Sequence, residues 1–126
     1  MRLLLDTSVF IWAVSSPEMI SRRAMPALRE ANAMRELSVV SLSEIAIKQA
    51  IGKLNLQRHE VEIGIADLKL RVLPYSASHA LKLFDLPLHH TDPFDRQLIA
   101  QALVEGIPMV TSDAKFKLYK GMKVIW

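Results

Sequence analysis

Five acidic side chains stand just after apolar runs of the sequence or at the starts of helical patterns, namely Asp6, Glu44, Asp92, Asp95 and Asp113. Asp6, Glu44 and Asp113 each follow a short run with the composition of a buried strand. Because the carboxyl ends of parallel strands meet at one edge of a sheet, we expect these three carboxylates to converge there. Asp92 and Asp95 open the longest helical pattern, just upstream of the fourth apolar run.

Converging carboxylates repel one another, and some of their pKa values must rise unless a cation neutralises them. Mg²⁺ and Mn²⁺ take oxygen ligands, keep several waters and need only one or two carboxylates directly. A metal held in this way lowers the pKa of a bound water, and two metals can stabilise both the attacking and the leaving oxygens of a phosphoryl transfer. The acids therefore predict metal-dependent phosphate chemistry that needs no histidine or lysine base.

Helix capping is the alternative explanation for several of these acids. Glu44 completes a Ser41-x-x-Glu44 capping box, and Asp92 followed by Pro93 is a typical helix N-cap. Taken singly, capping is the favoured explanation at Glu44 and Asp92. It does not predict that the acids converge, and it explains Asp113 least, since only a short basic helix could follow that residue.

The elements that would position the acids alternate between short apolar runs and amphipathic patterns. Strands are expected at residues 3–5, 37–40, 70–73, 109–111 and 123–125. Helices are expected at residues 7–13, 21–34, 41–51, 59–68, 76–84 and 92–105. Strands that are apolar throughout and separated by helices are typical of a parallel sheet covered on both faces.

The composition is that of one globular domain. The 126 residues are 51% hydrophobic and 23% charged, with a net charge of +3, which permits a polyanionic partner without requiring one. Without a cysteine the chain can form no disulfide scaffold, iron–sulfur cluster or thiol nucleophile, and it fits a reducing cytoplasm. The longest stretch without a charge, residues 7–17, is about half of what a transmembrane helix needs. We therefore expect a cytoplasmic protein with a single domain over residues 1–126.

Four motifs, taken in order, give the chain a specific resemblance. They are Leu4–Thr7, Glu44–Lys48 with Gly52–Leu54, His90–Arg96 running into Leu98–Ala102, and Thr111–Asp113 with Phe116, Tyr119 and Trp126. In these residues the sequence resembles the PIN-domain ribonucleases, most closely the VapC toxins of bacterial toxin–antitoxin pairs, over nearly its whole length. The resemblance implies an α/β fold: a single PIN-like domain whose central, mostly parallel sheet of about five strands, in the order 3-2-1-4-5, is flanked by helices.

The resemblance also assigns roles to residues of this sequence. The acidic quartet that holds Mg²⁺ or Mn²⁺ corresponds to Asp6, Glu44, Asp95 and Asp113. Asp92 corresponds to a neighbouring acid that could also bind the metal. Thr7 and Thr111 match hydroxyl positions that could bond a ligating carboxylate or a water.

The implied activity is endonucleolytic cleavage of RNA by a toxin. The implied partners are a cognate antitoxin protein and a second copy of the chain in a homodimer. As a hypothesis, metal held by Asp6 and Asp95 binds the scissile phosphate and an activated water. Glu44 and Asp113 would complete a second metal shell or orient that water, which then displaces the leaving oxygen in line.

Basic residues beside the acids are the candidates for RNA contact. Lys48, Arg96 and Lys115 flank the quartet and would neutralise RNA phosphates. Arg96 could equally pair with one of the acids. His89 and His90 lie close to the third motif's acids, but neighbouring side chains point apart and no third ligand has suitable spacing, so a zinc site is disfavoured.

Other parallel α/β folds with an acid after the first strand lack their own motifs here. A haloacid-dehalogenase-like phosphatase would need an aspartate at Ser8, a receiver domain would need one after the third strand, and a P-loop or dinucleotide domain would need a glycine-rich turn. Two alternatives stay open: a non-catalytic RNA- or protein-binding module whose acids are structural, and a metal-dependent phosphatase or DNase on the same site. A metal titration separates the first from a nuclease, and the choice of substrate settles the second.

Overall fold

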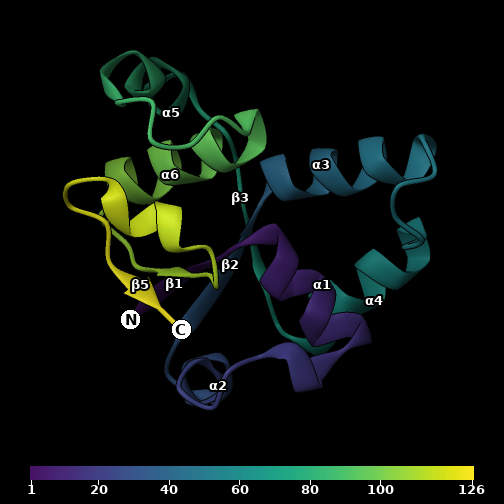
Figure 1. Ribbon diagram of the computed structural model, residues 1–126. Coiled ribbons are helices and arrows are strands. Elements are labelled where there is room, and N and C mark those ends of the chain that lie inside the picture. Colours follow the sequence, from purple (N-terminus) through teal and green to yellow (C-terminus); the bar gives the residue numbers. More distant parts are fainter.

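In the computed structural model, which describes residues 1–126, five short strands form one sheet in which every strand is parallel to its neighbours. The strands are β1 (Arg2–Leu5), β2 (Met34–Ser38), β3 (Arg71–Leu73), β4 (Met109–Val110) and β5 (Val124–Ile125). Their order across the sheet is β3-β2-β1-β4-β5, which confirms both the predicted order and the predicted parallel sheet. β1 is the central strand, with β2 and β4 on either side (Figure 1).

Helices cover both faces of this sheet (Figure 1). The α-helices are α1 (Thr7–Ser15), α2 (Ala24–Arg29), α3 (Val39–Ala50), α4 (Arg58–Asp67), α5 (Ala77–Lys82) and α6 (Pro93–Glu105). The chain also forms three short 3₁₀ helices, η1 (Pro17–Met19), η2 (Leu83–Asp85) and η3 (Ala114–Leu118). One core cluster joins one face of the sheet to α1, α2, α3 and α4, and a second joins the opposite face to α6 and η3.

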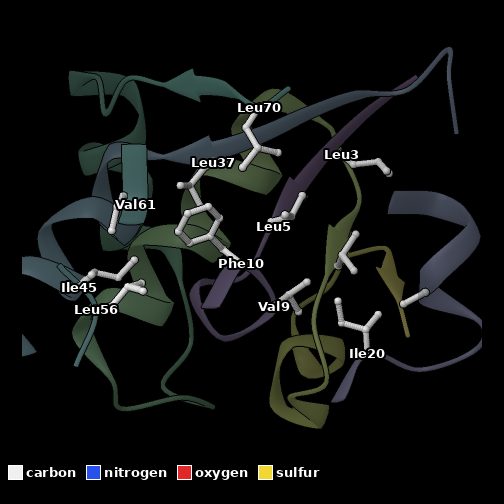
Figure 2. Close-up of a cluster of buried hydrophobic side chains, with 12 residues drawn as sticks. Leu3, Leu5, Val9, Phe10, Ile20, Leu37, Ile45, Leu56, Val61 and Leu70 are labelled. Atoms are coloured by element: carbon white, nitrogen blue, oxygen red, sulfur yellow. The ribbon is translucent and has the colours of Figure 1, made fainter. Parts of the chain in front are cut away.

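The alternation of side chains along β1 divides the core into these two clusters. Leu3 and Leu5 belong to the first cluster together with Phe10, as Figure 2 shows, whereas Leu4 belongs to the second. All three leucines are at most 1% exposed. Successive side chains of a strand point to opposite faces, and burying each leucine contributes about 2 kcal/mol of hydrophobic free energy. Both layers of the core therefore hold β1 in place immediately before Asp6.

The helix expected at residues 21–34 is wrong in its length. Only Ala24–Arg29 is helical, and Met34 already begins β2. Met34 pairs with Arg2 in the parallel register of β1 and β2, and its N–H donates to the carbonyl of Met1 at 2.6 Å. Pairing with the central strand therefore overrides the helical spacing of the apolar residues in this segment.

The strand expected at residues 37–40 is shifted: β2 ends at Ser38, and α3 begins with the next residue. The hydroxyl of Ser38 accepts a hydrogen bond from the N–H of Val40 at 3.0 Å, so Ser38 is the N-cap of α3. The capping box expected between Ser41 and Glu44 is therefore wrong. Glu44 lies in the second turn of α3 rather than the first, and capping does not occupy its carboxylate.

The longest helix, α6, carries Asp95 and has the boundaries that the sequence predicts. The Oδ1 of Asp92 accepts hydrogen bonds from the N–H groups of Phe94 and Asp95 at 2.8 and 3.0 Å, and Pro93 occupies the first helical position. Gly106 ends the helix with a φ of 67°, in the left-handed region that favours glycine. No helix of the structure combines the length and the apolar character needed to cross a membrane.

Candidate active site

The predicted acids come together at the carboxyl edge of the sheet. Asp6 follows β1 directly, and Asp113 follows β4. Glu44 comes from α3, and Asp95 comes from the first turn of α6. The charges of Glu44 and Asp113 act on Asp6, and these three acids together with Asp92 all act on Asp95. Elements that are far apart in the sequence therefore place their carboxylates in one cluster, as the topology of a parallel sheet favours.

Asp6 is buried, and its carboxylate accepts a hydrogen bond from a threonine hydroxyl. It is 5% exposed, and removal from water raises its pKa to about 6, although hydrogen bonds from Thr111 and Thr7 act in the opposite direction. The hydroxyl of Thr111 donates to Asp6 Oδ2 at 2.7 Å, and its oxygen accepts a hydrogen bond from the N–H of Asp113 at 3.1 Å. Thr111 therefore ties the acid after β1 to the acid after β4.

Asp95 is the acid most strongly perturbed by its surroundings. Burial raises the pKa of its carboxyl to about 8, and the charges of the neighbouring acids, led by Asp6, contribute to the rise. When several carboxylates lie this close together, each negative charge makes it less favourable for the others to ionise. The cluster therefore has the excess of negative charge that a bound cation neutralises.

Glu44 is buried, and only one of its two oxygens has a partner. Its Oε2 pairs with Lys48 Nζ at 2.6 Å, one helical turn further along α3, and this hydrogen bond raises the pKa of Lys48. Its Oε1 is buried without any hydrogen-bond partner. An unpaired buried polar atom costs about 1–3 kcal/mol, so a cation or donor that bound this oxygen would stabilise the protein.

Asp113 uses its two oxygens for different purposes. Its Oδ1 accepts a hydrogen bond from the N–H of Lys115 at 2.9 Å and caps η3, so the expectation that capping explains this acid least is wrong. Two residues of backbone suffice for such a cap, even before a short basic helix. Its Oδ2 lies 2.8 Å from Nε2 of His90, and the potential metal-ligating atoms of Asp113 and Asp95 lie within 4.8 Å of each other. Capping and membership of the cluster are therefore compatible in Asp113.

Unlike the hydroxyl of Thr111, the hydroxyl of Thr7 forms no hydrogen bond with a carboxylate of the cluster. Its Oγ1 lies 2.8 Å from Oγ of Ser41, and both residues are buried. This hydrogen bond joins the first turn of α1 to α3, so it holds the helix that carries Glu44 against the end of β1. The structure brings Thr7 near the acids without a bond from its hydroxyl to any carboxylate.

His90 is a residue of the cluster that the sequence reasoning missed. It is 7% exposed, and its Nε2 lies 3.0 Å from Asp95 Oδ2 and 2.8 Å from Asp113 Oδ2. The potential ligand atoms of these three residues all lie within 4.8 Å of one another. His89 is exposed, as expected for neighbours that point apart. The available signal was that His90 stands in the same motif as Asp95, whereas its contact with Asp113 depends on the fold.

The family model described as "PIN domain" matches residues 3–121. The chain belongs to the PIN-domain family. None of the proteins with a curated description matches the sequence of this PIN domain. The family explains why the order of the strands and the positions of the acids could be expected together.

Solved structures share the fold of this PIN domain. One is VapBC2 from Rickettsia felis bound to a DNA fragment from their promoter, with a TM-score of 0.72 and 15% identity over 98% of this chain and 97% of that chain. Another is DNA-bound VapBC from Salmonella typhimurium, with a TM-score of 0.67 and 16% identity over 98% of this chain and 96% of that one. A third is VapBC-5 from Mycobacterium tuberculosis, a member of the VapBC family of toxin-antitoxin systems, with a TM-score of 0.62 and 19% identity over 98% of this chain and 97% of that one.

The basic residues expected to contact RNA have different surroundings in the PIN domain. Lys48 lies at the rim of the cluster, where it pairs with Glu44. Lys115 is exposed directly after the cap formed by Asp113. Arg96 donates to three backbone carbonyls of the segment 86–90 at 3.0–3.4 Å and pairs with no carboxylate. Its guanidinium therefore holds in place the segment that ends in His90.

Proposed function

We propose that this PIN domain is a metal-dependent endoribonuclease that acts in the cytoplasm as the toxin of a toxin–antitoxin pair. The observation that carries the proposal is the cluster of Asp6, Glu44, Asp95 and Asp113 at one edge of the sheet, with Glu44 Oε1 buried and unpaired. Membership of the PIN-domain family and the fold shared with VapBC structures support the toxin assignment.

The donor atoms of the cluster suit Mg²⁺ or Mn²⁺. The four acids offer only carboxylate oxygens, which hard divalent cations prefer, and Glu44 Oε1 is an oxygen without a partner. Burial, together with the neighbouring negative charges, raises the pKa of Asp6 and of Asp95, and a cation would favour their charged forms instead. When bound, the cation would supply an activated water and neutralise charge that develops on the scissile phosphate.

The protein groups around the acids would orient them for this chemistry. Thr111 holds Asp6 Oδ2 by a 2.7 Å hydrogen bond, so the carboxylate cannot rotate freely. Lys48 holds Glu44 Oε2 at 2.6 Å and leaves Oε1 free to bind. Asp92 binds the N–H of Asp95 and so fixes the first turn of α6, which is a positioning role beside the quartet. Holding groups in place before reaction is a major source of catalytic rate.

RNA would approach this edge of the sheet through its phosphates. The Lys48 side chain is 40% exposed beside Glu44, and Lys115 is exposed two residues after Asp113. Both can neutralise phosphates that the acids would otherwise repel. Arg96, the third basic residue predicted to contact RNA, is half-buried and contributes to this surface through the segment 86–90 that it supports.

The PIN domain has an apolar cleft that suits the binding of a protein partner. The helices α3 and α4 enclose a cleft of about 600 Å³ whose lining is mostly hydrophobic, including Leu42, Ile45, Leu56, Val61 and Ile65. Such a cleft suits an apolar segment of a partner protein, which supports a cognate antitoxin. Three exposed apolar side chains close together in the sequence, Leu81, Phe84 and Leu88, support a homodimer, because Phe84 is 87% exposed.

The test is cleavage of RNA by the purified chain with Mn²⁺ or Mg²⁺ and then with a chelator. Single-stranded DNA and a phosphate monoester serve as comparison substrates, and the variant Asp6→Asn serves as the site control. We expect internal cuts in RNA that need both the metal and Asp6. If DNA or the monoester is cut while RNA stays intact, the protein is a phosphoesterase of another substrate class and not a ribonuclease. Intact substrates throughout, from folded protein without an antitoxin, would favour the non-catalytic binding module.

A further inference from the structure

Both ring nitrogens of His90 are engaged, and their partners fix where its proton lies. Nδ1 accepts a hydrogen bond from the backbone N–H of Asp92 at 3.2 Å. A backbone N–H can only donate, so Nδ1 must present a lone pair. Nε2 forms a hydrogen bond of 2.8 Å with Asp113 Oδ2 and lies 3.0 Å from Asp95 Oδ2. The arrangement requires a neutral imidazole that carries its single proton on Nε2.

The ring cannot easily turn to another arrangement. His90 is 7% exposed and packs edge-on against Phe116, with ring centroids 5.8 Å apart and an interplanar angle of 82°. The backbone N–H of His90 donates to the hydroxyl of Tyr119 at 2.9 Å. A half-turn of the ring would exchange both nitrogens for carbon atoms and leave the N–H of Asp92 without its acceptor.

We propose that His90 is a positioning residue that donates Nε2–H to Asp113 beside Asp95, and that its fixed tautomer keeps the imidazole out of the metal's ligand set. As a ligand, Nε2 would need a lone pair, so its proton would have to move to Nδ1. That proton would then face the N–H of Asp92 across 3.2 Å. The inference rests on the proposed function, because the same two acids would hold the cation.

The consequence is a selectivity for oxygen-binding cations. His90, Asp95 and Asp113 have the composition of a site for Zn²⁺, since two carboxylates and one imidazole lie within reach of one another. With the imidazole restricted to donating a hydrogen bond, only oxygens remain as ligands, and these suit Mg²⁺ and Mn²⁺. The hydrogen bond also holds Asp113 Oδ2, after β4, near the carboxylate of Asp95 in α6, which places two oxygens for the same cation.

The tautomer can be observed directly in the wild-type protein. Nitrogen NMR of ¹⁵N-histidine-labelled protein distinguishes the two neutral tautomers and the imidazolium, and the variant His90→Gln identifies the His90 signals by their loss. We expect a protonated Nε2 and an unprotonated Nδ1, both without metal and with saturating Mg²⁺. An Nδ1–H tautomer, a doubly protonated ring, or loss of the Nε2 proton when Mg²⁺ binds would overturn the proposal.

Metal affinity provides the second readout. We expect His90→Leu, which removes the donor, to bind Mn²⁺ about 10- to 100-fold more weakly in calorimetry. His90→Gln, whose amide can donate from nearly the same place, should remain within about threefold of wild type, and His59→Leu, at an exposed histidine of α4, serves as the control. Circular dichroism checks that each variant folds, and the NMR measurement does not depend on any variant folding.

The outcomes separate this inference from the proposed function. Wild-type affinity in His90→Leu would show that the donor does not position the acids. Binding of Zn²⁺ that is stronger than that of Mn²⁺ and is lost in His90→Gln would show that the imidazole is a ligand. Tight binding of Mn²⁺ with the expected tautomer but no RNA cleavage would overturn the ribonuclease and leave the role of His90 standing.

Discussion

Replacing Asp6 by asparagine should stabilise the metal-free protein while it removes a metal ligand. Asp6 has a pKa of about 6 in the fold against an ordinary value of 3.8, and burial is the main cause. A shift of about two units at about 1.4 kcal/mol each means that the charged carboxylate costs the folded state about 3 kcal/mol at pH 7. Asparagine has the same shape without the charge, and its Oδ1 can still accept the hydrogen bond from Thr111.

The effect has a definite dependence on pH. Because the pKa of Asp6 is higher in the folded state, the folded protein binds this proton more tightly than the unfolded chain does. The free energy of unfolding of the wild type should therefore fall as the pH rises from about 4 to about 6. Above about pH 6, Asp6 should cause no further decrease. The free energy of unfolding of the Asp6→Asn variant does not include this decrease. The variant should therefore become more stable relative to wild type as the pH rises from about 4 to about 6.

Urea denaturation in the presence of a chelator, repeated from pH 4 to pH 8, measures this difference. The variant Asp85→Asn, at an exposed acid of η2, is the matched control and should change stability little at any pH. Mn²⁺ should narrow the gap or reverse it, because binding stabilises only the chain that binds. If the Asp6→Asn protein is no more stable than wild type at pH 7 without metal, the claim that burying the charged Asp6 carboxylate destabilises the fold is refuted.

Three further predictions follow from particular contacts. Glu44→Gln should keep the fold, as judged by circular dichroism, but weaken Mn²⁺ binding at least about tenfold in calorimetry, since it replaces a buried ligand. Lys48→Met should leave Mn²⁺ binding as tight as in wild type or tighter, because a competing positive charge at 2.6 Å from Glu44 is removed, and should raise the KM for RNA. Gly64→Ala should cost about 1–3 kcal/mol in urea denaturation, because its new Cβ would lie 2.6 Å from Val14 Cγ2; unchanged stability would contradict the packing of α1 against α4.

The convergence of the acids could be expected from the sequence because it depends on topology more than on detail. Apolar runs and helical patterns predict a parallel sheet, and such a sheet brings the residues after its strands to one edge. This reasoning tolerates errors of a few residues, since Glu44 reaches the cluster although the start of α3 was placed two residues too late. The α6 boundaries were predictable for a local reason: Asp92, Pro93 and Gly106 each act on their own backbone.

Other features depend on contacts that spacing does not encode. Met34 is a strand residue because it pairs with Arg2, and that long-range pairing outweighs the helical spacing around it. The two valines that begin α3 favour a strand locally, but the Ser38 cap starts the helix there. His90 joins the cluster because the fold brings it beside Asp113, 23 residues away. No local pattern distinguishes such a buried histidine from an exposed one such as His89.

Titration of the metal-free protein with Mn²⁺ in a calorimeter tests the central claim most directly, because every function proposed for the cluster requires a cation there. The wild type should take up Mn²⁺ saturably, and both Asp6→Asn and Glu44→Gln should bind it at least about tenfold more weakly while remaining folded. A wild type that takes up no Mn²⁺ or Mg²⁺, or variants that bind as tightly as wild type, would contradict a metal centre built from these acids.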